Sequence, residues 1–287
     1  MATQSKLDRR LTPARDDLAA ASLRGKVEAP RYAEPAACRV IQAQAGLFRE
    51  PDAEKPFDTV LLLGEQFGVY EVVDGWAWGQ AVMDGYVGYV PASSLSPVRA
   101  DPTHAVSALG CQLYKEPRLK QPPFGALPFA ARVRVVETQD GYAHLANGMW
   151  APEPLLRPLD QPAKDWVAVA EQFAGVPYVW GGRSSTGIDC SGLVQLSLQA
   201  AGRKCLRDSD MQEATLGQTL EDGVDLRRGD VIFWRAHVGV MVDATTLLHA
   251  NAHHMAVARE PLTGAIERIA AAGDGNVTRR ARLATAS

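Results

Sequence analysis

The 287-residue sequence has few cysteines, no excess of basic residues and no long apolar run, and each shortage excludes a class of protein. Its four cysteines include no C-x-x-C pair, which excludes a disulfide scaffold and does not fit zinc-site spacing. Lysine and arginine total 30 against 33 acidic residues, and this net charge of −3 does not favour nucleic acid as the main partner. No apolar run approaches the roughly 18 residues that cross a bilayer, so we expect no membrane association.

The sequence has an ordinary globular composition, with 46% hydrophobic, 22% charged and 7% aromatic residues. A chain of this length corresponds to about two domains, or to three small ones. Charged side chains interrupt every apolar stretch in the first thirty residues, which does not fit a secretory signal. We therefore expect a cytoplasmic protein. The alternative is an exported protein whose leader peptide has been removed from this sequence. The oligomeric state is left open.

Residues 36–160 are β-rich and contain an internal repeat. Asp-Gly dipeptides beginning at Asp74 and Asp140 each lie between two strand-like runs, which is a strong signal for a β-hairpin. The run LFREP from Leu47 resembles LYKEP from Leu113. These two runs are 66 positions apart, and so are the two Asp-Gly dipeptides. Two copies of about sixty residues predict two small barrels, and the alternative is one larger β-domain.

Changes in composition divide the chain into four segments. Residues 1–35 form an N-terminal arm, with a short helix expected from Pro13 to Leu23. The two β-rich repeats occupy residues 36–100 and 101–160, and the last segment runs from 161 to 287.

The last segment has helical spacing first and strand-like runs afterwards, which indicates an α+β arrangement. Helices are expected from Lys164 to Phe173 and from Cys190 to Ala201. Strands are expected at three apolar runs, Val231–Trp234, His237–Val242 and Thr246–Ala250. The tail beyond Thr263 is interpreted as a solvated or flexible end.

The sharpest chemical signal lies at the start of the second expected helix. A glycine-rich run precedes Asp189, which stands where an N-cap is expected, and Cys190 then falls in the first turn. The partial positive charge of a helix N-terminus favours a thiolate over a thiol, and its free N–H groups can hold an oxyanion. Cys190 is therefore the candidate nucleophile, and a buried structural cysteine is the alternative.

A nucleophilic cysteine needs a base, and two histidines lie on strands expected to be neighbours. His237 begins one strand and His249 lies 12 positions later, in the next strand. One imidazole then takes the Cys190 proton while the other fixes its tautomer and orientation. A zinc site made by His249, His253 and Cys190 is an alternative use of the same residues.

Six separated motifs occur in order between residues 162 and 262. They are Tyr178-Val179-Trp180-Gly181-Gly182, Asp189-Cys190-Ser191-Gly192-Leu193, Arg207-Asp208-Ser209, Gly229-Asp230, His237-Val238-Gly239 and His249-Ala250. This pattern resembles the NlpC family of papain-like cysteine peptidases, and the β-rich repeats resemble the bacterial SH3-like domains of cell-wall enzymes. The resemblance implies two small all-β SH3-like barrels followed by an α+β papain-like domain.

The resemblance also implies a function, which is cleavage of bacterial cell-wall peptides, commonly at the γ-D-glutamyl–diaminopimelate bond. Cys190 would be the nucleophile, His237 its base and His249 the third polar member, with no metal or organic cofactor. A cytoplasmic type within the family recycles wall peptides of the L-Ala-γ-D-Glu-diaminopimelate class and requires an unblocked L-alanine.

The substrate contacts that the resemblance implies lie mostly in the last segment. Arg207 would pair with a substrate carboxylate, and a surface salt bridge is the alternative. The candidate contacts are Tyr178, Trp180, Asp189, Ser191, Arg207, Asp208 and Ser209, with Tyr86 and, more weakly, Asp58 from the first SH3-like domain. Two rival functions remain open, namely a degenerate protein that binds wall fragments and a Cys-His amidase or acyltransferase.

Overall fold

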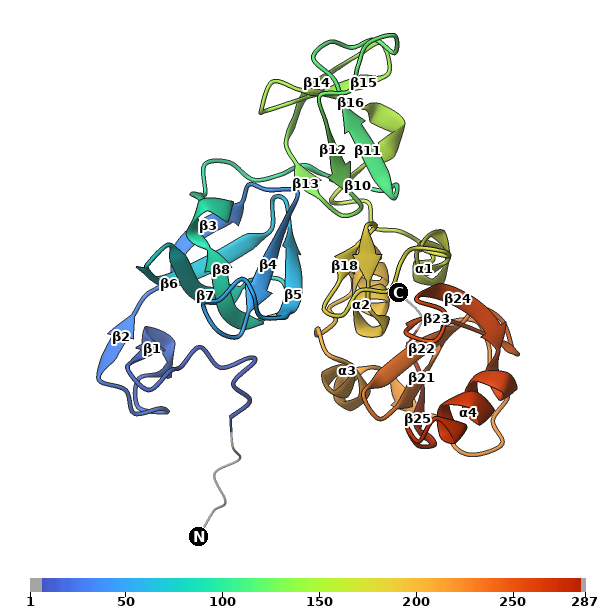
Figure 1. Ribbon diagram of the computed structural model, residues 1–287. Coiled ribbons are helices and arrows are strands. Elements are labelled where there is room, and N and C mark those ends of the chain that lie inside the picture. The colour runs from blue at the N-terminus through green and yellow to red at the C-terminus, as the bar shows by residue number, and fades with distance from the viewer. Residues whose placement is uncertain (1–6, 285–287) are drawn as a thin grey trace. The chain divides into compact units, whose positions relative to one another are not determined.

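The computed structural model describes residues 7–284, and the chain separates into two compact units (Figure 1). The first unit contains Met1–Val106, Cys111–Leu127 and Ala131–Leu156. The second contains Ser107–Gly110, Pro128–Ala130 and Arg157–Ser287. Among residues 7–284, no helix has the length and apolar character needed to span a bilayer.

A seven-stranded sheet in the order β5-β4-β8-β7-β6-β3-β9 forms the main part of the first unit. The hairpin between β6 and β7 turns at Asp74 and Gly75, whose φ values of 50° and 81° are both left-handed, as a type I′ turn requires. This predicted hairpin is confirmed. The strands are β3 Ala36–Val40, β4 Gln44–Phe48, β5 Phe57–Leu62, β6 Gln66–Val73, β7 Trp76–Ala81, β8 Val87–Pro91 and β9 Leu95–Pro97.

The second β-rich repeat has similar local elements but smaller sheets, in the orders β13-β10-β17, β11-β12 and β14-β15-β16. Its hairpin turns at Asp140 and Gly141 with φ values of 50° and 77°, which confirms the second predicted turn. In both repeats a strand that ends in proline leads into a 3₁₀ helix, Ala92–Ser94 or Glu153–Leu155. The strands are β10 His104–Val106, β11 Gly110–Leu113, β12 Gly125–Pro128, β13 Arg132–Val133, β14 Val135–Gln139, β15 Tyr142–Leu145, β16 Trp150–Pro152 and β17 Leu156–Pro158.

The N-terminal arm is extended rather than helical. Strand β1 (Leu18–Ala20) pairs in parallel with β2 (Arg31–Ala33), and only Ala21–Leu23 forms a 3₁₀ turn, so the predicted helix in the arm is wrong. The reason is a tertiary contact, because the Arg15 guanidinium lies 4.5 Å from the ring centroid of Trp78 and pairs with the Glu71 carboxylate. These contacts hold the arm against the seven-stranded sheet.

The second unit is built on an antiparallel six-stranded sheet in the order β20-β25-β21-β22-β23-β24, with helices packed against it. The two predicted helices and the three predicted strands are all present, as α1, α2, β21, β22 and β23, so helices precede the sheet strands as expected. The helices are α1 Trp166–Gln172, α2 Cys190–Ala200, α3 Ser209–Thr215 and α4 Leu262–Ala271. The strands are β18 Arg183–Ser184, β19 Gly187–Ile188, β20 Gln218–Thr219, β21 Asp230–Trp234, β22 His237–Met241, β23 Thr246–Asn251, β24 Ala256–Pro261 and β25 Val277–Arg282.

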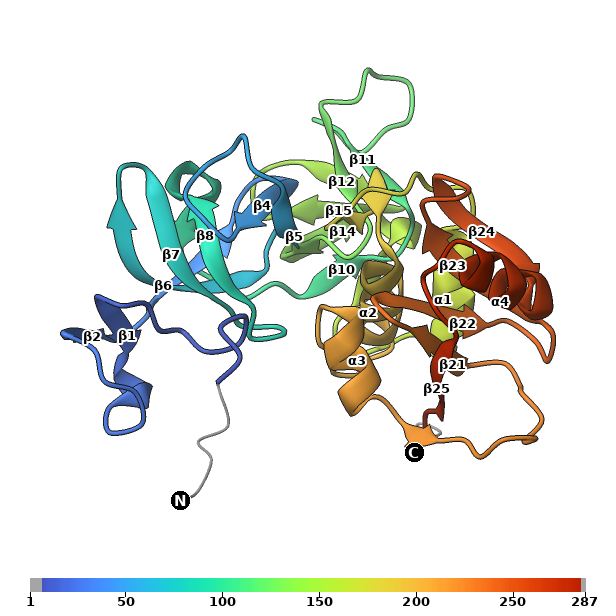
Figure 2. The same ribbon diagram turned by 60° about the horizontal axis from the view of Figure 1, so that its bottom comes forward.

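The C-terminal tail is part of the core of the second unit, so the prediction of a solvated or flexible end is wrong. Helix α4 lies beside β23 and β24 (Figure 2), and its buried residues Leu262, Ala265 and Ile269 recur at helical spacing. They pack against apolar side chains of the sheet, including Trp234 and Leu247. Strand β25 pairs along β21, so the tail supplies both a covering helix and an interior strand.

Candidate active site

Cys190 is the first residue of α2, as the sequence predicts. The Asp189 side chain caps this helix by accepting a hydrogen bond from the Gly192 N–H at 2.6 Å. A β-carbon on Gly192 would lie 2.5 Å from the Gly182 carbonyl oxygen, so glycine is needed for the close approach of the glycine-rich loop. The local sequence therefore fixes where the candidate nucleophile sits.

Cys190 is buried, with 8% of the residue exposed, and the helix that it begins packs against strand β22. The backbone N–H of Val238, the residue after His237, hydrogen-bonds to its sulfur. Burial, assisted by the negative charge of Asp189, raises the pKa of the Cys190 thiol to about 12. The resting site therefore favours the neutral thiol, and the expectation that the helix N-terminus alone would favour a thiolate is not met.

The two predicted histidines meet across β22 and β23. His237 Nε2 and His249 Nδ1 are 2.8 Å apart, and the ring centroids are separated by 5.0 Å. A β-carbon on Gly239 would lie 3.1 Å from the His249 β-carbon, so the glycine after Val238 gives the second imidazole its space. The prediction that neighbouring antiparallel strands bring these rings together is confirmed.

Two residues that the sequence analysis missed continue this hydrogen-bond chain. His249 Nε2 lies 2.7 Å from Glu260 Oε1, and Arg268 Nη2 lies 2.5 Å from the same oxygen. Glu260 is on β24 and Arg268 is on α4, within the tail that was expected to be solvated. The only sequence signal for them was the apolar spacing of α4, which indicates that this part of the tail packs on the sheet.

Burial keeps both imidazoles neutral at pH 7. It lowers the pKa of His237 to about 3, and the positive charge of Arg268, with that of His249 where it is protonated, acts in the same direction while Glu260 opposes them. Burial also lowers the pKa of His249 to about 4, against the opposing effect of its hydrogen bond to Glu260. A neutral His237 can accept a proton, which is what a general base requires.

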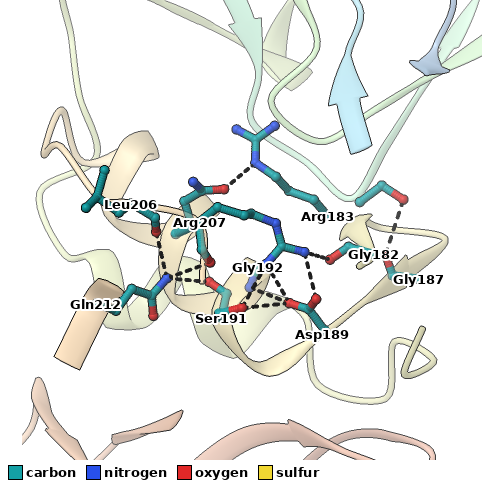
Figure 3. Close-up of polar contacts among 11 residues, drawn as sticks. Gly182, Arg183, Gly187, Asp189, Ser191, Gly192, Leu206, Arg207 and Gln212 are labelled. Carbon is teal, nitrogen blue, oxygen red and sulfur yellow. Dashed lines mark hydrogen bonds and ion pairs between the residues drawn. The ribbon is translucent and has the colours of Figure 1, made fainter. Parts of the chain in front are cut away.

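Asp189, Ser191 and Arg207 form a buried polar network at the start of α2 (Figure 3). Arg207, 1% exposed, donates to both carboxylate oxygens of Asp189, at 2.9 and 2.7 Å. It also donates to Ser191 Oγ at 2.8 Å and to the Gly182 carbonyl at 3.3 Å. Its guanidinium is thus occupied inside the fold, and neither the predicted pairing with a substrate carboxylate nor a surface salt bridge describes it.

The other predicted contacts of this unit are more accessible. Trp180 is 68% exposed, while Asp208 and Ser209 are partly exposed at the start of α3. Burial of the half-buried Tyr178, with the negative charge of Asp189 nearby, raises its pKa to about 12, so its hydroxyl stays a proton donor at pH 7.

The contacts expected from the first SH3-like domain are less accessible. Tyr86 is only 3% exposed, buried within the first unit, so little of its side chain is free to touch a ligand. The correction has a simple reason, since Tyr86 follows the tight Asp84-Gly85 turn that directs it into its own core. Asp58, the weaker candidate, is half-buried on β5.

The structure does not group His249, His253 and Cys190 as the ligands of a zinc ion. Between residues 7 and 284, no three His, Cys, Asp or Glu side chains are grouped as metal ligands. His253 is exposed and its ring contacts His254, at 4.7 Å between centroids, while His249 is engaged by His237 and Glu260.

Two stretches of the chain match known protein families. Residues 175–269 match the NlpC/P60 family, and residues 47–95 match the bacterial dipeptidyl-peptidase SH3 domain. A crystal structure of an NlpC/P60 family protein from Bacillus cereus superposes with a TM-score of 0.73 at 20% identity, covering 86% of this chain and 99% of that one. This likeness concerns the fold.

Curated relatives match in shorter stretches. The γ-D-glutamyl-L-lysine dipeptidyl-peptidase of Bacillus subtilis is 34% identical over 97 residues, which are 31% of this chain and 32% of that protein. A probable endopeptidase of Haemophilus influenzae is 36% identical over 87 residues, 28% of this chain and 53% of that protein. The chain thus spans about a third to a half of the length of these relatives. It carries a bacterial dipeptidyl-peptidase SH3 domain in its first unit and an NlpC/P60 family domain in its second.

Proposed function

We propose that this protein is a cysteine peptidase that cleaves the γ-D-glutamyl bond to a diamino acid in peptides derived from peptidoglycan. The observation that carries the proposal is the arrangement of Cys190, His237 and His249. Cys190 begins a helix, and its sulfur accepts a hydrogen bond from the backbone N–H of the residue after His237. The His237 ring in turn is hydrogen-bonded to His249. The NlpC/P60 match covers all three residues, and one relative is named for a γ-D-glutamyl-L-lysine bond.

In the first half of the reaction, the Cys190 sulfur attacks the γ-carbonyl of D-glutamate while its proton passes to neutral His237. Because the resting thiol is neutral, the thiolate forms only as this transfer occurs. The Tyr178 hydroxyl and N–H groups at the start of α2 hold the negative oxygen of the tetrahedral intermediate.

In the second half, protonated His237 gives its proton to the leaving amine of the diamino acid, and the acyl group stays on sulfur as a thioester. Water then attacks the thioester, with His237 accepting a proton from water and returning one to the Cys190 sulfur. His249 holds the ring of His237 through both halves by the 2.8 Å hydrogen bond.

The substrate we propose is a free peptide with an unblocked N-terminal L-alanine, as in recycling of wall peptides in the cytoplasm. Trp180 offers an exposed ring face to such a peptide, and the Asp208 carboxylate offers a partner for its ammonium group. The third residue of the peptide is diaminopimelate or lysine, both of which present the same α-amine as leaving group.

The test compares wild type with Cys190→Ala on L-Ala-γ-D-Glu-diaminopimelate and on its lysine counterpart. Wild type should release L-Ala-D-Glu and the free diamino acid, whereas Cys190→Ala should show no turnover and still bind peptide in calorimetry. Cys205→Ala is the matched control, since Cys205 is a second buried cysteine of the same unit that forms no disulfide and should be dispensable for turnover. Wild type without turnover on any wall peptide, or full activity of Cys190→Ala, would overturn the proposal.

The recycling role and the reaction type need two further comparisons. Peptides blocked at the amine and intact sacculi should be poor substrates, and efficient digestion of sacculi contradicts recycling. Reactions with an added amine acceptor separate a hydrolase, which yields the free acid, from a transferase, which yields a new amide.

A further inference from the structure

The hydrogen-bond chain that begins at His237 continues through three further side chains. His237, His249 and Glu260 come from the consecutive strands β22, β23 and β24, and Arg268 comes from α4. The successive distances are 2.8, 2.7 and 2.5 Å. His249 is 0% exposed, so water does not replace any of its partners.

Only one arrangement of protons satisfies this chain when Glu260 is ionised and both imidazoles are neutral. A carboxylate only accepts hydrogen bonds, so His249 Nε2 must carry a proton. The other nitrogen of a neutral imidazole is an acceptor, so His249 Nδ1 accepts and His237 Nε2 donates. His237 Nδ1 is then left with its lone pair.

Glu260 is held in the ionised form that this arrangement requires. Burial acts to raise the pKa of Glu260, but hydrogen bonds from Arg268 and His249 outweigh burial and lower it below its usual range. The two histidines in turn stay neutral, because burial lowers the pKa of each. A neutral side chain at position 260 would not fix the direction, since an amide can donate to His249 as well as accept from it.

We propose that Glu260 and Arg268 are positioning residues that select the tautomer of His237, so that its Nδ1 is free to take the proton of Cys190. Neither residue touches substrate. The tautomers are a property of the free protein, and only their catalytic consequence rests on the proposed function.

Arg268 gives this arrangement a second property. Glu260 alone would attract a proton onto His249 and turn it into an imidazolium, which has no acceptor for His237. Arg268 cancels that charge while leaving Glu260 Oε1 as a hydrogen-bond acceptor. The carboxylate therefore orients His249 without charging it. The charged and titratable groups around the pair are Glu260, Arg268 and, beyond β23, His254.

The direct test is nitrogen NMR of the full chain labelled at its six histidines, which distinguishes Nδ1–H from Nε2–H tautomers. Wild type should show Nε2–H for both His237 and His249. Glu260→Gln should give mixed tautomers, and Arg268→Met should raise the pKa of His249 towards that of a free imidazole. Wild type with a proton on His249 Nδ1 would overturn the proposal without any variant.

Kinetics supply the second readout. Glu260→Gln should lower kcat roughly 10- to 100-fold with KM little changed, because the base is present but often in the wrong tautomer. Arg268→Lys should retain the wild-type tautomers and most of kcat. Glu267→Gln, which removes an exposed carboxylate of the same helix, is the matched control and should behave as wild type.

The outcomes separate this proposal from the proposed function. If no wall peptide is cleaved but the wild-type tautomers are as expected, the peptidase assignment fails and the positioning role stands. If Glu260→Gln has both the tautomers and the kcat of wild type, the positioning role fails and the peptidase stands. Should Glu260→Gln not fold, the wild-type spectrum and the Arg268 variants still decide the outcome.

Discussion

Two polar networks in the second unit each combine a carboxylate with an arginine, yet they are built differently. Around Asp189 the network is closed, because Arg207 and Ser191 bond to each other as well as to the carboxylate. On the sheet the network is an open chain, in which His249 has His237 on one side and Glu260 on the other.

The difference indicates what each network is for. A closed set of hydrogen bonds fixes the position of a backbone, here the N-terminus of the helix that begins at Cys190. An open chain of groups that both donate and accept fixes the direction of its protons. We therefore expect substitutions in the first network to lower the free energy of unfolding. Substitutions in the second should change the catalytic rate and its pH dependence.

The largest effect is expected from opening the closed network. Arg207→Met leaves the buried Asp189 without its charged partner, and loss of one member of a buried ion pair costs about 3–5 kcal/mol. The measurement is the free energy of unfolding from urea titration. Arg228→Met is the control, because Arg228 is 38% exposed and its pairings with Asp165 and Glu171 should each contribute less than about 1 kcal/mol. Equal losses in the two variants would remove the distinction.

Breaking the open chain should change rate more than stability. His249→Gln keeps side-chain bulk but removes the imidazole that orients His237, so kcat should fall roughly 10²-fold with KM nearly unchanged. That fall corresponds to about 2.7 kcal/mol of transition-state stabilisation. Steady-state kinetics check it, with His254→Gln as the control, because His254 is an exposed histidine in the turn after β23. A rise in KM at constant kcat would assign His249 to binding instead.

The sequence allowed the features of fold and site that depend on neighbours along the chain to be predicted. The cap at Asp189, the helix start at Cys190 and the turns at Asp74 and Asp140 each follow from a few adjacent residues. The pairing of His237 with His249 followed from two strands joined by a short turn.

Other features depend on tertiary contacts that no local pattern carries. The tail was interpreted as solvated because no motif in it could be assigned, yet Arg282 on β25 bonds to both carboxylate oxygens of buried Asp230. The link from His249 to Glu260 needs the pairing of β23 with β24, and the link to Arg268 needs α4 folded back on the sheet.

Acid should destabilise the protein through the open chain. Burial lowers the pKa of His249 to about 4, whereas the unfolded chain binds a proton near pH 6.5. Its contribution to stability is therefore fully present above pH 6.5 and is lost as the pH falls from there towards 4. At pH 5 the loss should be about 2 kcal/mol for this one buried imidazole. Urea unfolding at pH 7 and pH 5 measures it, and His249→Gln should reduce the difference; an unchanged difference would contradict the assignment.

The smallest effect is expected where the sequence and the structure give different roles to one hydroxyl. Ser191 was a candidate substrate contact, but its Oγ is bonded to Asp189 and Arg207 and the residue is 6% exposed. Ser191→Ala should therefore cost about 1 kcal/mol of unfolding free energy and leave KM unchanged, because Arg207 keeps its bonds to Asp189. Ser209→Ala is the contrasting variant, since Ser209 is partly exposed. If Ser209 touches the peptide, its replacement should raise KM without a change in stability. A rise in KM for Ser191→Ala would mean that the closed network opens towards substrate, and the contrast between the two networks would then no longer hold.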